Sequence, residues 1–186
     1  MKTAFVTGGA RGIGRAIAAN LARDHKVAIT YNKTAPEALL AEHPEILALQ
    51  ADLSSPNAPR DIIDAVLGEF GQIDVIVNNA GAITMTALDQ VDATCEAHQF
   101  AINVTAPMAL LSAALPHLKR GASIVNISSV NAVLPAIGAS GYSASKAALN
   151  TWTRGAAKAL GPKRIRVNAV APGAIEREES PRPPEL

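Results

Sequence analysis

Short apolar runs recur along the chain and alternate with longer stretches whose apolar residues are spaced as on one face of a helix. The runs predict six strands: TAFVTG, KVAITY, ILALQA, IDVIVNNAG, ASIVNISS and IRVNAVAPG. Helical spacing is clear within residues 13–21, 62–67 and 109–118. Because the strand runs are apolar throughout rather than alternating, both faces of each strand are expected to be buried. The pattern therefore predicts an α/β fold, a doubly wound parallel sheet with helices on both faces.

Length and composition fit one domain, and the net charge gives it no strong electrostatic field. The chain has 186 residues, of which 48% are hydrophobic and 18% charged, and its formal net charge is +1. Such a balance favours neither nucleic acid nor an anionic membrane as a partner. The start MKTAFVTGG lacks the long apolar stretch of a signal peptide, and the single cysteine, Cys95, allows no intramolecular disulfide. We expect a cytoplasmic protein with one domain over residues 1–176 and a loop or tail over 177–186.

The segment TGGARGIG, residues 7–14, stands between the first expected strand and the first expected helix. Gly8, Gly12 and Gly14 are spaced as GxxxGxG rather than as the common GxGxxG. Glycines here permit a tight turn, close approach of the backbone to a pyrophosphate, and exposed amide groups at the positive end of a helix. Glycine-rich turns are also ordinary connectors, so it is the α/β context that makes this segment predict nucleotide binding.

The end of the second expected strand favours NADP over NAD. The usual dinucleotide fold has an acidic residue there, but this chain reads Tyr31, Asn32 and Lys33. A carboxylate would repel a 2′-phosphate, whereas Lys33 and Arg11 could pair with one through charge-assisted hydrogen bonds. The alternative for both cations is a solvated loop charge. Asp52, after the third strand, could accept from an adenine amino group or could equally begin the next turn.

Four later segments complete an ordered set with the glycine turn. They are NNAG at 78–81, NISS at 126–129, YSASK at 142–146 and VAPG at 170–173. Together the five segments strongly resemble the short-chain dehydrogenase/reductase family over residues 3–176. That family has a Rossmann-type fold and uses a nicotinamide cofactor to interconvert alcohols and carbonyls. The resemblance implies an NADP(H)-dependent oxidoreductase for a small carbonyl or alcohol, with 3-oxoacyl-carrier-protein reductase as one subtype.

The resemblance also implies a catalytic group of four residues. Tyr142 and Lys146 match the YxxxK motif of the family, Asn103 in AINVTAP matches its asparagine, and Ser129 stands thirteen positions before Tyr142. Ser129 is preferred to Ser128 because family spacing and strand alternation both favour it, which makes Ser128 point to the other face. Taken singly, each residue has an ordinary structural alternative; the ordered set favours catalysis.

Carbonyl reduction explains why these residue types belong together. The reaction needs a hydride on carbon and a proton on oxygen, and a nicotinamide supplies only the hydride. Free tyrosine ionises near pH ~10, and a nearby cation favours its ionised form. Residues four apart share a helix face, so Tyr142 could donate the proton beside the cation of Lys146. Ser129 could hold the substrate oxygen, and Asn103 could position a water between Lys146 and solvent.

By the same resemblance, the turn and four later stretches would hold the cofactor. The pyrophosphate and nearby ribose would lie at Gly8, Arg11, Gly12, Ile13 and Gly14, the adenosine ribose at Asn32 and Lys33, and the adenine at Asp52 and Leu53. The path between the riboses would follow Asn79, Ala80 and Gly81. The nicotinamide end would contact Tyr142, Lys146, Pro172, Gly173 and Ile175. No metal site is expected, because the histidines have no ligand spacing with one another or with Cys95.

The final residues depart from the family pattern. Members commonly have a threonine where this chain has Arg177, and they continue through a substrate-binding segment, a helix and a seventh strand, whereas ten residues follow Glu176 here. An exposed sixth strand would need a subunit or another segment to protect it, and we expect a homo-oligomer, a dimer or tetramer. A pocket open to water predicts weak or absent turnover with cofactor binding partly retained. The alternative function is a non-catalytic nucleotide-binding sensor or assembly module.

Overall fold

A computed structural model describes residues 1–175 of the chain, and Arg177 and the expected tail over 177–186 lie outside the described residues. Six strands form a single sheet in the order β3-β2-β1-β4-β5-β6, and every neighbouring pair is parallel. They are β1 (Lys2–Val6), β2 (His25–Tyr31), β3 (Leu47–Gln50), β4 (Val75–Asn78), β5 (Ser123–Ile127) and β6 (Arg166–Val170). The expected strands and the doubly wound α/β fold are confirmed.

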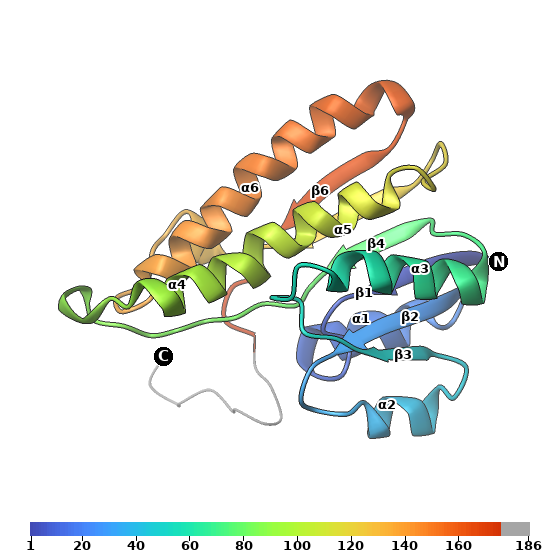
Figure 1. Ribbon diagram of the computed structural model, residues 1–186, viewed down its shortest axis with the longest axis horizontal. Coiled ribbons are helices and arrows are strands. Elements are labelled where there is room, and N and C mark those ends of the chain that lie inside the picture. The colour runs from blue at the N-terminus through green and yellow to red at the C-terminus, as the bar shows by residue number, and fades with distance from the viewer. Residues whose placement is uncertain (176–186) are drawn as a thin grey trace.

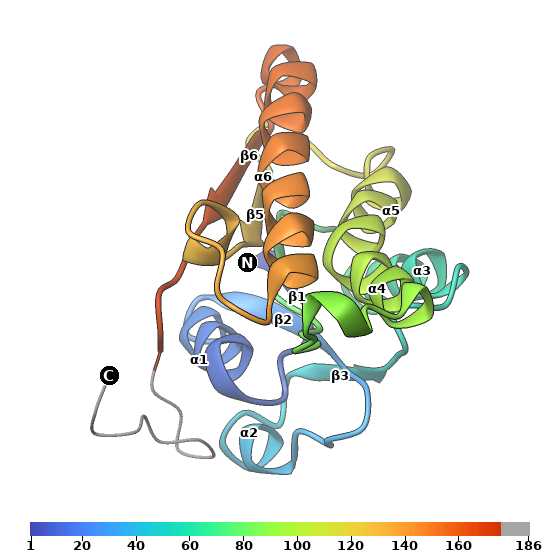
Figure 2. The same cartoon turned by 90° about the vertical axis from the view of Figure 1, so that its left-hand side faces the viewer.

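Helices cover both faces of this sheet (Figures 1 and 2). One face carries α1 (Gly12–Leu21) and α2 (Glu37–Glu42). The other carries α3 (Ala58–Phe70), α4 (Ala93–Phe100), α5 (Ala106–Ala114) and α6 (Ser140–Leu160). A π-helical turn, Ala101–Thr105, joins α4 to α5 without a break. Short 3₁₀ turns lie at Leu88–Gln90, Val130–Ala132 and Gly161–Lys163.

Successive residues of the central strand β1 face two different cores. Phe5 packs with Ile76 and other buried residues on the side of α3, α5 and α6. Ala4 and Val6 pack with Ile29 on the side of α1 and α2. Full burial of a large aliphatic or aromatic side chain stabilises the fold by about 1.5–3 kcal/mol relative to exposure. Burial on both faces is the physical reason why the strand runs are apolar throughout.

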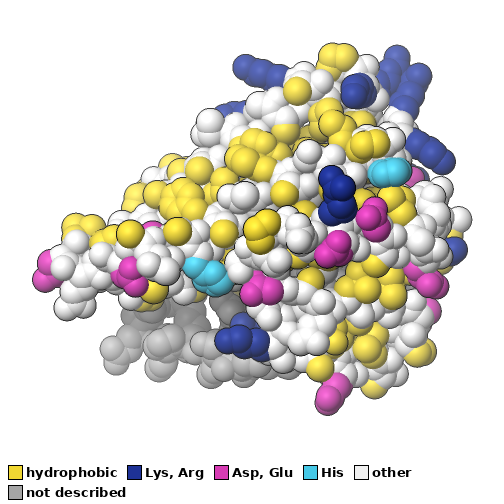
Figure 3. Space-filling view, viewed as in Figure 1, with side chains coloured by type: hydrophobic (Ala, Val, Ile, Leu, Met, Phe, Trp, Pro, Cys, Tyr) yellow, Lys and Arg dark blue, Asp and Glu magenta, His cyan; other side chains and the backbone are white. Residues whose placement is uncertain are grey.

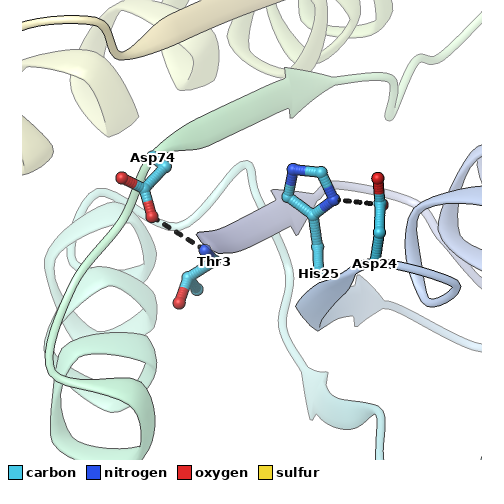
Figure 4. A network of polar contacts seen from close by, with 4 residues as sticks. All are labelled: Thr3, Asp24, His25 and Asp74. Atoms are coloured by element: carbon cyan, nitrogen blue, oxygen red, sulfur yellow. Dashed lines mark hydrogen bonds and ion pairs between the residues drawn. The ribbon is translucent and has the colours of Figure 1, made fainter. Parts of the chain in front are cut away.

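Polar contacts fix the amino ends of the central strands (Figure 4). Asp74, just before β4, accepts the backbone N–H of Thr3 through Oδ2 at 2.8 Å, and the Asp74 N–H donates to the carbonyl of Thr3 at 2.9 Å. At the start of β2, Nδ1 of His25 lies 2.5 Å from Oδ1 of Asp24. These contacts occupy the edge of the sheet where the strands begin, so they do not obstruct the edge where ligands bind in such folds.

The last described strand, β6, forms one side edge of the sheet. Within residues 1–175 no strand pairs with its outer side, and Val167 is the one buried residue of its five. Its inner side is paired with β5 along the whole strand. The exposed sixth strand that the sequence predicts is therefore present in the described part of the chain.

Candidate active site

The carboxyl ends of the strands border a cavity of about 530 Å³. Residues that follow all six strands line it, because parallel pairing brings these segments to one edge of the sheet. Every residue predicted to contact the cofactor lines this cavity: Gly8, Arg11, Gly12, Ile13, Gly14, Asn32, Lys33, Asp52, Leu53, Asn79, Ala80, Gly81, Tyr142, Lys146, Pro172, Gly173 and Ile175. Of the predicted catalytic residues, Ser129, Tyr142 and Lys146 line it and Asn103 does not.

The glycine turn after β1 has a backbone conformation and a close packing that only glycine fits without strain or overlap. Gly8 and Gly12 have φ values of +65° and +53°, in the left-handed region that glycine tolerates. A Cβ on Gly14 would overlap the carbonyl oxygen of Gly8 and the side-chain amide of Asn79. The N-cap residue of α1, Arg11, makes no side-chain capping hydrogen bond. The first turn of α1 therefore offers backbone amides and a positive dipole end to an anion such as a pyrophosphate.

Three side chains that sequence reasoning did not single out for this purpose hold the turn in place. Nδ2 of Asn79 donates to the carbonyl oxygens of Thr7 and Gly8 at 2.9 and 3.1 Å. Oγ1 of Thr7 accepts the backbone N–H groups of Asn79 and Ala80, both at 2.9 Å. Oγ1 of Thr30 accepts the N–H of Gly8 at 3.2 Å. In the sequence, Thr7 stands directly before the glycines, and this position could have indicated that it supports the turn.

The adenosine end of the cavity carries the charges that the sequence predicts. Arg11 and Lys33 are exposed, and neither joins an ion pair within residues 1–175. Oδ1 of Asp52 accepts from the hydroxyl and the backbone N–H of Ser54 at 2.7 and 2.9 Å. These two hydrogen bonds lower the pKa of Asp52, so the carboxylate is ionised at neutral pH. Asp52 thus begins a turn through one oxygen while it also lines the cavity.

Lys146 lines the cavity beside Tyr142. Its side chain is buried, and Nζ donates to the carbonyl oxygen of Ile127 at 2.8 Å. Nζ lies 5.7 Å from the ring centroid of Tyr142, which stands in the first turn of α6. Burial lowers the pKa of Lys146 to about 8. The amine is therefore still mostly protonated at neutral pH, which places a buried cation beside the ring of Tyr142.

Ser129 and Ser128 have different surroundings at the end of β5. Oγ of Ser129 accepts the N–H of Asn131 at 3.1 Å, which leaves the hydroxyl proton free for another acceptor. The hydroxyl of Ser128 is directed at α6, where its oxygen lies 3.5 Å from the carbonyl oxygen of Lys146, although Ser128 also borders the cavity. Of the two hydroxyls, that of Ser129 keeps its proton free, and it lines the same cavity as Tyr142.

Asn103 lies against Gly81, which lines the cavity, and its predicted role in positioning a water stays a prediction. It is buried in the π-helical turn, outside the cavity lining. Its Oδ1 accepts the N–H of Ala82 at 2.8 Å, and Nδ2 donates to the Ala82 carbonyl at 2.8 Å and to Oγ of Ser145 at 2.9 Å. Both amide hydrogens are used, so among the side-chain groups only Oδ1, which has a second lone pair, could bind the predicted water. Through these hydrogen bonds it also fastens the segment after β4 to α6.

The described residues, 1–175, offer neither a metal centre nor a membrane-spanning helix. No group of three or more His, Cys, Asp and Glu side chains there is placed to hold a metal ion. No helix in the same range is long and apolar enough to cross a membrane.

Comparisons of sequence and structure agree with one another. The family model described as short chain dehydrogenase matches residues 2–181. An uncharacterized oxidoreductase of Methylorubrum extorquens is 37% identical over 186 residues, 95% of this chain and 74% of that protein. The chloroplastic NADPH-dependent aldehyde reductase 1 of Arabidopsis thaliana is 36% identical over 188 residues, 94% of this chain and 65% of that protein. The crystal structure of a short chain dehydrogenase from Burkholderia cenocepacia in complex with NADP has a TM-score of 0.92 and 42% identity, over 97% of this chain and 77% of that one.

The sheet order, the glycine turn and the cavity at the strand ends define a dinucleotide-binding α/β protein. The chain belongs to the short-chain dehydrogenase/reductase family and is an NAD(P)-dependent oxidoreductase.

The buried ammonium of Lys146 predicts a pH-dependent stability. Its pKa is about 8 in the folded chain, against an ordinary value of 10.5. Between these values the unfolded chain binds more protons, so the free energy of unfolding rises with pH, by roughly 3 kcal/mol over the whole window. Urea unfolding of the wild type and of Lys146→Met measures this, because the variant lacks the titration. The wild type should gain stability relative to the variant from about pH 8 to about pH 10.5; a constant difference would contradict the burial of a charged lysine.

Proposed function

We propose that the chain interconverts a carbonyl and an alcohol with NADP(H), with Tyr142 as the acid/base. The observation that carries this proposal is the convergence of Ser129, Tyr142 and Lys146 on the cavity that the glycine turn also lines. Segments after β2 and after β5 are three strand spacings apart in the sheet, on the order of 14 Å. That span suits a dinucleotide that lies across the strand ends, with its reactive end near Tyr142.

The residues present fit NADP. The glycine turn would hold the pyrophosphate, Asp52 would accept from the adenine, and Arg11 and Lys33 would pair with a 2′-phosphate. The Burkholderia cenocepacia neighbour in complex with NADP and the Arabidopsis relative named NADPH-dependent support the same cofactor here. When bound, the reduced cofactor supplies the hydride for the carbonyl carbon.

The chain's own residues would manage the proton. Ser129 donates a hydrogen bond to the substrate oxygen and holds it beside the phenol of Tyr142. Tyr142 gives its proton to that oxygen as negative charge develops there, and takes a proton back when an alcohol is oxidised. The ammonium of Lys146 stabilises the phenolate that remains after donation. Asn103 would position a water between Lys146 and solvent, and it fixes the position of α6 through Ser145.

The surface around the proposed acid supports an uncharged substrate. Residues 79–88 and 127–142 contain no Asp, Glu, Lys or Arg. Their exposed large apolar side chains are Ile83, Met85, Leu88, Val133, Leu134 and Ile137. An apolar ketone or aldehyde would bury these side chains without leaving a charge unpaired. The 3-oxoacyl-carrier-protein subtype has less support, because these two segments offer no cation to an acidic carrier.

Replacement of Tyr142 tests the acid/base role. Tyr142→Phe removes the transferable proton and keeps the ring, so kcat should fall by about 10²–10⁴-fold while NADPH affinity changes little. The measurement is the loss of NADPH absorbance with a panel of aldehydes, apolar ketones and 3-oxoacyl thioesters. Thr151→Ala, on an exposed position of α6, is the control and should keep the wild-type rate. Equal rates for wild type and Tyr142→Phe would refute the role; NADPH binding without any turnover would favour the non-catalytic sensor.

Replacement of the two exposed cations tests the cofactor preference. Arg11→Ala and Lys33→Ala each remove a partner of the 2′-phosphate, and a hydrogen bond to a charged group contributes roughly 1.5–3 kcal/mol. Each variant should therefore bind NADPH about tenfold or more weakly, with little change for NADH, as measured by cofactor fluorescence. Arg15→Ala is the matched control, because Arg15 pairs with Glu42 at 2.8 Å and does not line the cavity. Equal losses for both cofactors would contradict the assignment.

We also propose that the chain forms a homo-oligomer. β6 is an unpaired edge within the described residues, and apolar side chains gather over α5 and α6 in the space-filling view (Figure 3). Trp152 of α6 is partly buried against the core and lies outside the cavity. Edge strands and apolar surfaces are what a second copy would cover. Light scattering should give a mass two or four times 19.2 kDa; a monomer at every concentration would disprove this.

A further inference from the structure

α4 contributes a buried amide that no step of the proposed reaction uses. Gln99 has an exposed fraction of 0%, and both ends of its side chain are paired. Oε1 accepts the backbone N–H of Thr84 at 2.8 Å, and Nε2 donates to Oε2 of Glu96 at 3.0 Å. A buried amide left without partners is costly, so this pairing fixes the three groups relative to one another. Gln99 thereby ties the segment after β4 to α4.

The carboxylate of Glu96 lies against Gly141, the residue directly before Tyr142. A Cβ built on Gly141 would overlap both carboxylate oxygens, so the contact depends on glycine. The first turn of α6 contains no acidic residue, and its N-cap residue, Ala139, makes no side-chain capping hydrogen bond. A negative charge near the amino end of a helix is stabilising because it faces the positive end of the dipole. Glu96 supplies that charge from α4, which lies beside the start of α6 (Figures 1 and 2).

Asn103 makes a second bridge of the same kind one helical turn further along. It binds the segment after β4 and Ser145 of α6, and Ser145 directly precedes Lys146. The hydroxyl of Ser145 in turn donates to the carbonyl oxygen of Tyr142 at 2.7 Å. Gly141, the residue before Tyr142, is therefore contacted by Glu96 of α4. Ser145, the residue before Lys146, is contacted by Asn103 of the π-helical turn that continues α4.

We infer that Glu96 and Gln99 are positioning residues: they hold the first turn of α6 so that the Tyr142 hydroxyl stays in place beside the substrate oxygen. The inference rests on the proposed acid/base role of Tyr142. Neither residue lines the cavity, so neither touches cofactor or substrate directly. A displacement on the order of 1 Å at a reacting group can cost about 10²-fold in rate, so a small shift of this turn is consequential.

Tyrosine signals in nuclear magnetic resonance spectra give a readout that does not need turnover. The chain has two tyrosines, so protein with isotope-labelled tyrosine gives two sets of ring signals, which Tyr142→Phe assigns. Gln99→Leu and Glu96→Ala should each shift and broaden the Tyr142 signal and leave that of Tyr31 unchanged. Glu96→Gln keeps the shape and an acceptor for Gln99 but removes the charge, so its Tyr142 signal should lie between those of the wild type and Glu96→Ala.

Gly141→Ala tests the same contact from the side of α6, because the added methyl group displaces the flexible carboxylate of Glu96. It should reproduce the effect of Glu96→Ala on the Tyr142 signal, and the double variant should add nothing to either single change. Gly155→Ala is the matched control: it lies in the same helix, and a Cβ there would meet no atom within 4 Å. That variant should leave the Tyr142 signal unchanged and raise the unfolding midpoint.

Kinetics separate positioning from general destabilisation. Gln99→Leu and Glu96→Ala should lower kcat by about tenfold or more while the dissociation constant of NADPH stays within about twofold, because the cofactor contacts are untouched. An unchanged Tyr142 signal and kcat, with only a lowered unfolding midpoint, would overturn the inference. If the wild type shows no turnover, the proposed function fails, and the Tyr142 signals alone then decide whether α4 positions the start of α6.

Discussion

The parallel pairing of all six strands is the constraint on which the cavity depends. In an antiparallel sheet, the segments after consecutive strands would lie at opposite edges, and the glycine turn could not meet the segments that follow β2 and β4. Parallel pairing needs a crossover after each strand, and those crossovers cover the sheet and bury both of its faces. The apolar character of the strands and the collection of polar site residues at one edge therefore have the same cause.

The cavity has exposed cations at one end and a buried cation at the other, and this difference in burial gives them different effects. Arg11 and Lys33 are exposed, where water screens them and where they are free to meet an anionic group. Lys146 is buried, and the same desolvation that lowers its pKa also strengthens its electrostatic effect on the neighbouring phenol. A lysine in that position is costly for folding and useful for proton transfer for one and the same reason. The uncharged segments at 79–88 and 127–142 border the region where such a charge is effective.

The sequence allowed the fold and the lining of the cavity to be predicted, because both leave local signals. Buried strands appear as unbroken apolar runs, the phosphate turn as glycines, and Tyr142 with Lys146 as a helical spacing. The bridges made by Asn103 and Gln99 and the support of the turn by Thr7 depend on which side chains meet across elements, and no local pattern records those partners. The short helix α2 was not singled out either, since the six residues Glu37–Glu42 span fewer than two turns, too few to show a repeated apolar spacing. The domain limit at residue 176 and the cytoplasmic location stay predictions.

The π-helical turn between α4 and α5 has a consequence for how this region can vary. Each residue added to or removed from a helix rotates everything beyond it by about 100°. Gln99 and Asn103 both bind the segment after β4, and the turn at Ala101–Thr105 sets their relative direction. Many substitutions on the outer face of α4 would leave these contacts intact, whereas a single insertion or deletion between the two amides would break one of them. In this stretch the number of residues is under tighter constraint than most of their identities.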